Sequence, residues 1–248
     1  MPPATSPGRD FATRAHVRFA LDGEGFMLGE NDPTRQSGAR FWLQRTFDQT
    51  TWRLRASVPD LVKSRISALA ATEPAFSNDR APPVHWDAYR ALLSQAGPIE
   101  AERHGPVYLL DANLPVPPGL EVLASESAEA AALIARWRAE GMPKALFDIG
   151  FTAPEELWAP WRLLMLDGEP AAVGQTARLS PFGVEAGVIT VPEHRLKGLG
   201  AAVVAAWTHC PQLAGLPLYY STSHDNLGSQ GIARRLGAVR LGDEWSVS

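Results

Sequence analysis

A chain of 248 residues with 45% hydrophobic and 20% charged residues has the composition of a globular protein, which excludes a disordered or fibrous one. Its net charge of -4 excludes bulk attraction to nucleic acid or to an anionic membrane, so any anion-binding site must be local. The single cysteine, Cys210, excludes an intramolecular disulfide framework and a multi-cysteine zinc site. No stretch approaches the roughly 18 apolar residues of a membrane span, and residues 1–10 lack the apolar core of a signal peptide, so we expect a cytoplasmic protein.

The first half of the chain alternates strand-like and helix-like segments. Residues 1–10 are rich in proline, which favours a flexible arm. Apolar periodicity predicts short strands at 14–21, 51–58 and 105–112 and helices at 58–74 and 84–97. The apolar face of the first helix would consist of Leu61, Ile66, Leu69 and Ala70.

A proline-rich segment divides the chain into two regions. Residues 113–120 (NLPVPPGL) read as a linker, so we place a domain boundary near residue 116. The region from 11 to 115 would then be an N-terminal α/β region, and residues 116–248 would form a second domain. In that domain the order of elements is strand, helix, three strands, helix, strand, helix and strand, with Asp167-Gly168 as a hairpin turn. This order predicts an α+β fold, a mixed sheet with helices on its faces.

The turn between the predicted strand at 183–191 and the predicted helix at 199–210 has the features of an anion-binding site. The first backbone N–H groups of a helix have no internal partner and carry the positive end of the helix dipole. Gly198 and Gly200 would let a ligand approach the backbone, and Arg195 and Lys197 add full charges. A purely structural turn beside a solvated basic pair explains this stretch equally well.

Two motifs that follow each other along the chain together resemble those of the GNAT N-acetyltransferase superfamily. Pro192, Arg195, Gly198 and Gly200 have the spacing of its acyl-CoA pyrophosphate loop. Downstream, DNLGSQGIARRLGA resembles its next motif, whose key positions here are Asn226, Ser229, Ile232, Arg235, Leu236 and Gly237. The resemblance implies a GNAT-like acyltransferase fold for residues 116–248, with acetyl-CoA or another acyl-CoA as co-substrate.

The resemblance also implies which residues hold the co-substrate. Backbone N–H groups from Leu196 to Ala201 would hold the pyrophosphate beside Arg195, and the strand residues before the loop would pair with the pantetheine arm. Asn226 would bond the same arm or cap the following helix. The predicted binding residues are Ile189, Thr190, Val191, Arg195, Leu196, Lys197, Gly198, Leu199, Gly200, Ala201, Asn226 and Ser229.

The catalytic groups are less well specified. An alkyl amine is neutral only about once in two thousand at pH 7, so a base must take its proton before it attacks the thioester. By the resemblance Glu185 is the first candidate and His224 the second, although a solvated glutamate and a structural histidine fit the same positions. Many relatives carry a tyrosine where this chain has Ala233, so Tyr219 or Tyr220 would have to supply the leaving thiolate with a proton, or water would do so.

The resemblance implies transfer of an acetyl group to a primary amine by direct attack on the thioester in a ternary complex. The absence of basic or acidic tracts favours a small-molecule acceptor, without nucleic acid or membrane as a partner, and a homodimer is compatible with the sequence. The downstream motif of this chain, with Ser229 and with Ala233 in place of the tyrosine, resembles the form found in the ribosomal-protein acetyltransferase-like and glycine-acyltransferase-like branches. Acetylation of a protein amine and a catalytically inactive CoA-binding regulatory module are therefore alternatives.

Two further features have competing explanations. The N-terminal region could be a cap, a degenerate acyltransferase-like copy or a dimerisation element, and its Trp42, Trp52 and Trp86 could line an acceptor pocket or form core. His209 and Cys210 end the predicted helix at 199–210, and Cys210 lies on its apolar face. We therefore expect Cys210 in the core and no metal site.

Overall fold

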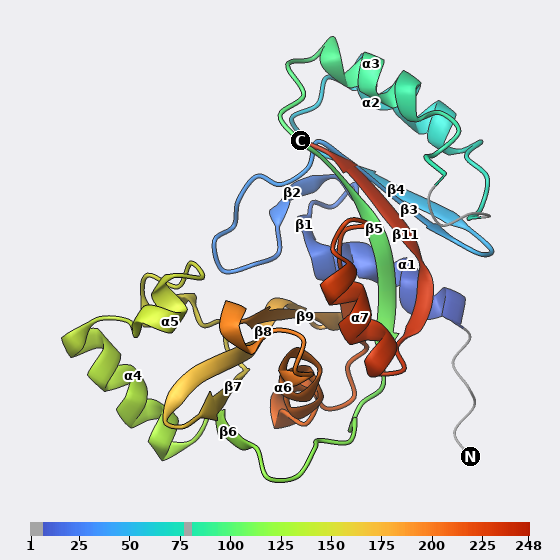
Figure 1. The fold of residues 1–248 in the computed structure, drawn as a ribbon. Helices are drawn as coiled ribbons and strands as arrows, with labels where there is room; N and C mark the ends of the chain where they lie inside the picture. Colours follow the sequence, from blue (N-terminus) through green and yellow to red (C-terminus); the bar gives the residue numbers. More distant parts are fainter. Residues whose placement is uncertain (1–6, 77–80) are drawn as a thin grey trace.

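The computed structural model describes residues 7–76 and 81–248, and a nine-stranded sheet runs through it (Figure 1). The strands are β1 (Phe19–Leu21), β2 (Met27–Glu30), β3 (Phe41–Thr46), β4 (Thr50–Leu54), β5 (Glu102–Leu110), β6 (Glu121–Ala124), β7 (Trp161–Leu166), β8 (Glu169–Ser180), β9 (Gly183–Thr190), β10 (Leu218–Ser221) and β11 (Val239–Val247). The large sheet has the order β4-β3-β11-β5-β10-β9-β8-β7-β6, and β1 pairs with β2 in a separate sheet. Within the described chain β9 and β10 are the one parallel pair, so the predicted mixed sheet is confirmed.

Helices cover both faces of this sheet. One face carries α1 (Pro7–Arg18), α4 (Ala128–Glu140) and α5 (Lys144–Phe147). The other face carries α2 (Asp60–Ala70), α3 (Trp86–Ser94), α6 (Leu199–Trp207) and α7 (Leu227–Arg235). Because side chains alternate along a strand, each central strand contributes to a core on both sides. No helix in the described ranges is long and apolar enough to cross a lipid bilayer.

The two predicted regions share the large sheet. β5, which precedes the predicted linker, pairs antiparallel with β10 on one side and with β11 on the other. The chain that leaves β10 passes so close to β5 that a Cβ on Gly105 would collide with the carbonyl oxygen of Thr222. Residues on either side of position 116 are therefore neighbours in one sheet, and Figure 1 shows β5 and β11 side by side through its middle.

The N-terminal elements differ from the sequence prediction first at α1. The predicted strand at 14–21 is wrong in its first part, because α1 continues to Arg18. The buried side of α1 carries Arg14 and Arg18, which are four residues apart. The helix was missed because hydrophobic periodicity places arginines on the solvent-exposed side. Residues 1–6 of the predicted arm lie outside the described residues, and residues 7–10 belong to α1.

The predicted helix at 58–74 is confirmed as α2, but its buried face is rotated. Leu61 is 66% exposed, whereas Val62, Ile66 and Ala70 are buried. Val62 packs there against apolar side chains of β3 and β4. The predicted helix at 84–97 is confirmed as α3.

The tryptophans of the N-terminal region belong to different elements. Trp42 and Trp86 are buried, Trp42 on β3 and Trp86 on α3, and Trp52 lies on β4. Cys210 is also buried in the core, as predicted, and burial raises the pKa of its thiol to about 11. His209 bonds the carbonyl oxygen of Leu114 through Nε2, at 2.7 Å.

Candidate functional site

The parallel strands β9 and β10 part soon after they meet. Their pairing joins Leu218 to Val184 and Tyr219 to Glu185, whereas β9 continues to Thr190. Beyond Glu185 the edge of β9 that faces β10 has no neighbouring strand, so its backbone groups can pair with an extended ligand.

The loop after β9 leads directly into the N-terminus of α6. Gly198 precedes α6 with φ +84°, a left-handed conformation that glycine adopts without strain. Arg195 donates from Nε to the carbonyl oxygen of Thr190 at 3.2 Å and so holds the loop against β9. Leu196 is 99% exposed. The first N–H groups of α6, a nine-residue helix, are available to an anion here.

A cavity of about 660 Å³ lies where β9, this loop and the first turns of α6 and α7 meet; we call it the α6–α7 cavity. Of the predicted binding residues, those that line it are Ile189, Thr190, Arg195, Leu196, Gly198, Leu199, Gly200, Ala201, Asn226 and Ser229. Val191 and Lys197 are not among its lining residues, and Val191 is buried. The structure thus brings ten predicted residues to one cavity, and their binding role stays a prediction.

Arginines of α7 add positive charge to the cavity. Arg234 and Arg235 line it, and a Cβ on Gly198 would collide with Nη1 of Arg235. The glycine therefore makes room for the guanidinium against the loop. Arg235 was part of the downstream motif without an assigned role, and its position 37 residues after Gly198 in the sequence gave no sign of this contact. Three arginines, with Arg195, now surround one helix N-terminus.

Asn226 and Ser229 begin α7. The Asn226 side-chain oxygen accepts a hydrogen bond from the Ser229 N–H at 2.9 Å, so Asn226 caps the helix. The Ser229 hydroxyl is 2.6 Å from the Tyr220 hydroxyl of β10. Burial raises the pKa of Tyr220 to about 12, so the phenol stays protonated at neutral pH. Tyr220 is buried and is not among the lining residues of the cavity, so its hydroxyl reaches the cavity through Ser229, which lines it. Ala233 also lies buried in the core.

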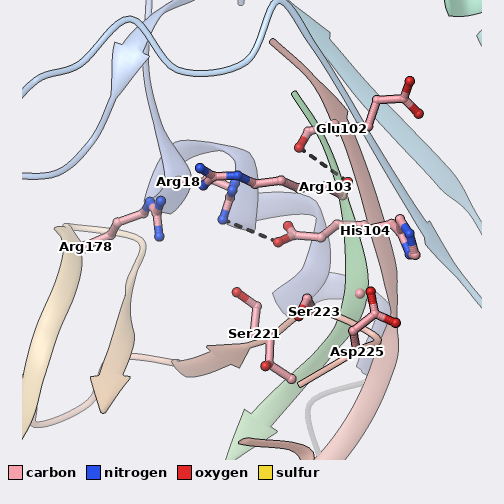
Figure 2. A pocket seen from close by; sticks show the side chains of 12 residues that line it. Arg18, Glu102, Arg103, His104, Arg178, Ser221, Ser223 and Asp225 are labelled. Carbon is pink, nitrogen blue, oxygen red and sulfur yellow. Dashed lines mark hydrogen bonds and ion pairs between the residues drawn. The ribbon is translucent and has the colours of Figure 1, made fainter. Parts of the chain in front are cut away.

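A second cavity, of about 370 Å³, lies at the end of β10; we call it the α1-side cavity. Its lining includes Arg18 of α1, Arg178 of β8, Ser221 and Asp225 after Tyr220, and Glu244 of β11 (Figure 2). His224 is not among the lining residues of either cavity.

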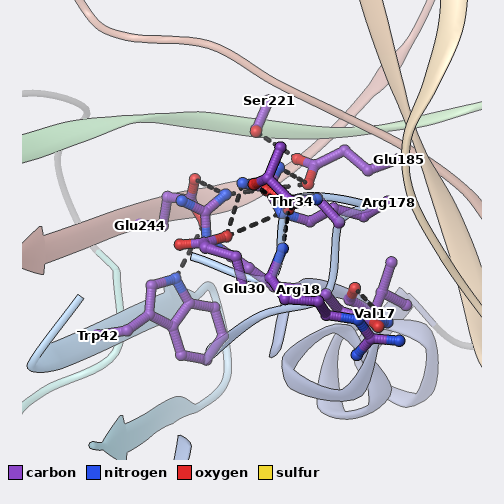
Figure 3. A network of polar contacts seen from close by, with 12 residues as sticks. Val17, Arg18, Glu30, Thr34, Trp42, Arg178, Glu185, Ser221 and Glu244 are labelled. Carbon is purple, nitrogen blue, oxygen red and sulfur yellow. Dashed lines mark hydrogen bonds and ion pairs between the residues drawn. The ribbon is translucent and has the colours of Figure 1, made fainter. Parts of the chain in front are cut away.

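Glu185 lies in a buried ionic network beside the α1-side cavity (Figure 3). Its Oε1 accepts hydrogen bonds from Arg14 Nη2, at 2.8 Å, and from the Ser221 hydroxyl, and its Oε2 accepts one from Arg178 Nη1 at 2.9 Å. Burial alone would raise the pKa of Glu185, but the charges of Arg14, Arg178 and Arg18 outweigh it and hold that pKa far below the usual range. Such a carboxylate is a weak proton acceptor.

The network extends from α1 to β11. Arg14 bonds Glu244, Gln44 and Glu185, and Trp42 donates from Nε1 to Glu244 at 3.0 Å. Arg178 donates to Glu30 of β2 at 2.7 and 3.0 Å. The side chains of Arg14 and Glu185 are only 1% and 3% exposed, so each charge depends on its partners.

Comparisons with protein-family models and with curated proteins find no match. Among solved structures, a GCN5-related N-acetyltransferase from Kribbella flavida matches at 23% identity over 63% of this chain and 62% of its own, with a TM-score of 0.42. An acetyltransferase of the GNAT family from Colwellia psychrerythraea matches at 15% identity over 80% of this chain and 76% of its own, with a TM-score of 0.39. A Drosophila protein matches at 14% identity over 98% of this chain and 87% of its own, with a TM-score of 0.48.

The chain spans less than two thirds of the Kribbella protein and of a GNAT-family protein from Novosphingobium aromaticivorans, 62% and 65% respectively. At these TM-scores the likeness to solved structures does not decide the function. The residues of the two cavities carry the functional inference.

Replacing Arg14 by methionine should destabilise the protein by about 3–5 kcal/mol, because Glu185 and Glu244 would stay buried with fewer partners. Urea unfolding at pH 7 measures this change. Arg138→Met is the matched control, since Arg138 pairs with Glu155 at the surface and its loss should leave stability nearly unchanged.

Acidification adds a second readout to this experiment. Because the folded protein lowers the pKa of Glu185, its stabilising contribution is full above the ordinary glutamate pKa of about 4.3 and declines as the pH falls below that value. Between about pH 5 and pH 3 the free energy of unfolding should therefore fall more in the wild-type protein than in Arg14→Met. Equal losses would contradict the assigned role of Arg14.

If the α6–α7 cavity binds CoA, as the sequence resemblance predicts, replacing Gly198 by alanine should weaken that binding about tenfold or more, because the methyl group would displace Arg235 and the residue would strain at φ +84°. Isothermal titration calorimetry measures the affinity. Gly215→Ala is the control: Gly215 has φ +79° with open space around it, so it should show the strain without the loss of affinity. An equal loss in both variants would show that the Arg235 contact is unimportant.

Proposed function

We propose that the protein is an acyl-CoA-dependent N-acyltransferase that moves an acetyl group from acetyl-CoA to a primary amine, in a small molecule rather than a protein. The observation that carries this proposal is the parting of β9 and β10 beside a glycine-containing turn and the N-terminus of α6. This arrangement offers an extended backbone edge and an anion site in one continuous cavity. A co-substrate with a polar, extended arm and a pyrophosphate matches both features.

The phosphates would lie at the start of α6. The N–H groups of Leu199 to Ala201 face no helical partner, and Arg195, Arg234 and Arg235 supply the compensating charge. Gly200 lets α6 pack closely against α7 and β9, since a Cβ there would lie 2.8 Å from Cδ1 of Ile232 and 3.0 Å from Oγ1 of Thr190. The pantetheine arm would pair with β9 at Val188–Thr190, and the Asn226 amide, which already caps α7, would contribute its Nδ2 hydrogens.

Bound acetyl-CoA would supply an activated acetyl carbonyl. The amine nitrogen, having lost one proton to water, attacks that carbon, a C–N bond forms, and the nitrogen gives a second proton to water. The C–S bond breaks with the electron pair on sulfur. The thiolate then takes a proton from the Tyr220 and Ser229 hydroxyl pair, and Tyr220 is the group predicted to replace the missing tyrosine. Tyr220 is protonated at neutral pH, as a donor must be, and its raised pKa makes it a weaker acid than an ordinary tyrosine.

The proton of the ammonium must leave before the attack. Glu185 and His224 were predicted as candidate bases; the arginines around Glu185 make it a weak base, and His224 lines neither cavity. We assign Glu185 a positioning role, in which it holds the Ser221 hydroxyl where β9 and β10 part. Loss of Glu185 should therefore impair folding as well as turnover.

The proposal is tested by titrating CoA and acetyl-CoA calorimetrically and by measuring thiol release from acetyl-CoA with a panel of primary amines. Binding with turnover is expected. Binding without turnover on any amine, protein N-termini included, would favour the regulatory module. Failure of CoA to bind would remove the basis of the proposal.

Replacing Tyr220 by phenylalanine should lower kcat by about 100-fold with little change in the KM for acetyl-CoA, because the variant loses a proton donor and keeps the binding loop. Steady-state thiol release measures both constants. Tyr219→Phe is the neighbouring control, since Tyr219 packs with Val17 on the α1 face of the sheet. A similar kcat loss in both variants would contradict the donor role.

A further inference from the structure

The α1-side cavity lies across the sheet from the α6–α7 cavity. Val184 and Ala186 of β9 pack against α6, so Glu185 between them faces the α1 side. In the same way Tyr220 faces α7 and Ser221 faces Glu185. The two cavities therefore lie on opposite faces of the sheet, with Ser221 lining one and Ser229, the partner of Tyr220, lining the other.

Arg18 differs from the other arginines of the network. Arg14 and Arg178 direct their terminal nitrogens at Glu185, Glu244 and Glu30 in hydrogen bonds. Arg18 donates no side-chain hydrogen bond among the described residues: its Nη1 forms ion pairs at 3.3 Å from Glu244 and 3.8 Å from Glu185, and its guanidinium lies over the Phe19 ring. Its Nε, like that of Arg14, is buried without a hydrogen-bond partner in the described part of the chain.

Burial of the Arg18 guanidinium destabilises the folded protein. Its side chain is 10% exposed and lines the α1-side cavity. A buried guanidinium with unused donors is destabilising unless a ligand or water completes its bonds. A carboxylate suits it best, because the planar fork of an arginine matches the two oxygens of a carboxylate.

The charges around the cavity favour a ligand that carries both signs. Its lining includes three arginines and three carboxylates, namely Arg18, Arg103, Arg178, Glu102, Asp225 and Glu244. Figure 2 shows Arg18 and Arg178 on one side and Asp225 on the other. A polyamine would place a cation at Arg18, and a phosphate ester would add negative charge that the lining does not balance.

We propose that the α1-side cavity is the acceptor site and takes an amine that also carries a carboxylate, as an amino acid does. Arg18 binds the carboxylate, and the amine lies toward Ser221, where it reaches the thioester through the gap between β9 and β10. This assignment rests on the proposed acyltransferase function and names its acceptor class.

The test compares amino acids with amines that lack only the carboxylate. The pairs are L-alanine and ethylamine, L-phenylalanine and phenethylamine, and L-lysine and cadaverine. With saturating acetyl-CoA, kcat/KM from thiol release should be at least about tenfold higher for the acid of the preferred pair. Saturation-transfer NMR in the presence of CoA gives a binding readout that does not depend on turnover, and it should show the same preference.

Variants of Arg18 separate recognition from folding. Arg18→Gln should bring the ratio of kcat/KM within each pair to about one, chiefly through KM for the acid, and Arg18→Lys should restore only part of the preference. Because the ratio is taken within one protein sample, a loss of folded protein does not mimic this result. Arg138→Gln, at an exposed pair with Glu155, should keep the wild-type ratio.

The failure of each proposal gives a different result. Equal kcat/KM and equal NMR binding for both members of every pair, or an unchanged ratio in Arg18→Gln, would overturn the acceptor assignment. Wild-type protein that does not bind CoA would instead overturn the acyltransferase function. Binding of CoA with preferential NMR binding of the acids supports the α1-side cavity as a site for carboxylated amines.

Discussion

Buried charge around Glu185 constrains how the elements of this protein come together. A carboxylate and an arginine that are both almost fully buried are stable only when their partners are in place. Here the partners come from α1, β8 and β11, and Ser221 adds a bond from β10. The network therefore fixes α1 against the middle of the sheet, and with it Arg18 at the edge of a cavity.

The same strands have different chemistry on their two faces. Toward α6 and α7 the side chains of β9 and β10 are apolar, except for the hydroxyl of Thr190 and that of Tyr220, which is 2.6 Å from the Ser229 hydroxyl. Toward α1 they are charged and polar. The α6–α7 cavity and the α1-side cavity lie on these two faces, and β9 and β10 separate just beyond Glu185. This arrangement suits the proposed acyl transfer, in which each of the two substrates would enter from its own face of the sheet.

Much of the local structure was predictable because it depends on short-range patterns. Asp167 and Gly168 both adopt positive φ, as an Asp-Gly hairpin turn requires, and the helices at 127–141, 199–210 and 226–237 appear as α4, α6 and α7. Gly198 was predicted to loosen the loop and has the left-handed conformation. The prediction failed for charged residues that the fold buries. Arg14 and Arg18 were expected at the surface because they are charged, yet they form the buried side of α1.

The sequence by itself determined the elements of residues 116–248 and the group of residues at the start of α6, since both follow from spacing along the chain. Only the tertiary structure decided that β5 lies between β10 and β11, that Arg235 lies against Gly198, and that Glu185 is surrounded by arginines. Those contacts join residues far apart in sequence, and no local periodicity records them. The chemistry of Glu185 changed accordingly, because a carboxylate acquires its pKa from charges that the fold brings to it.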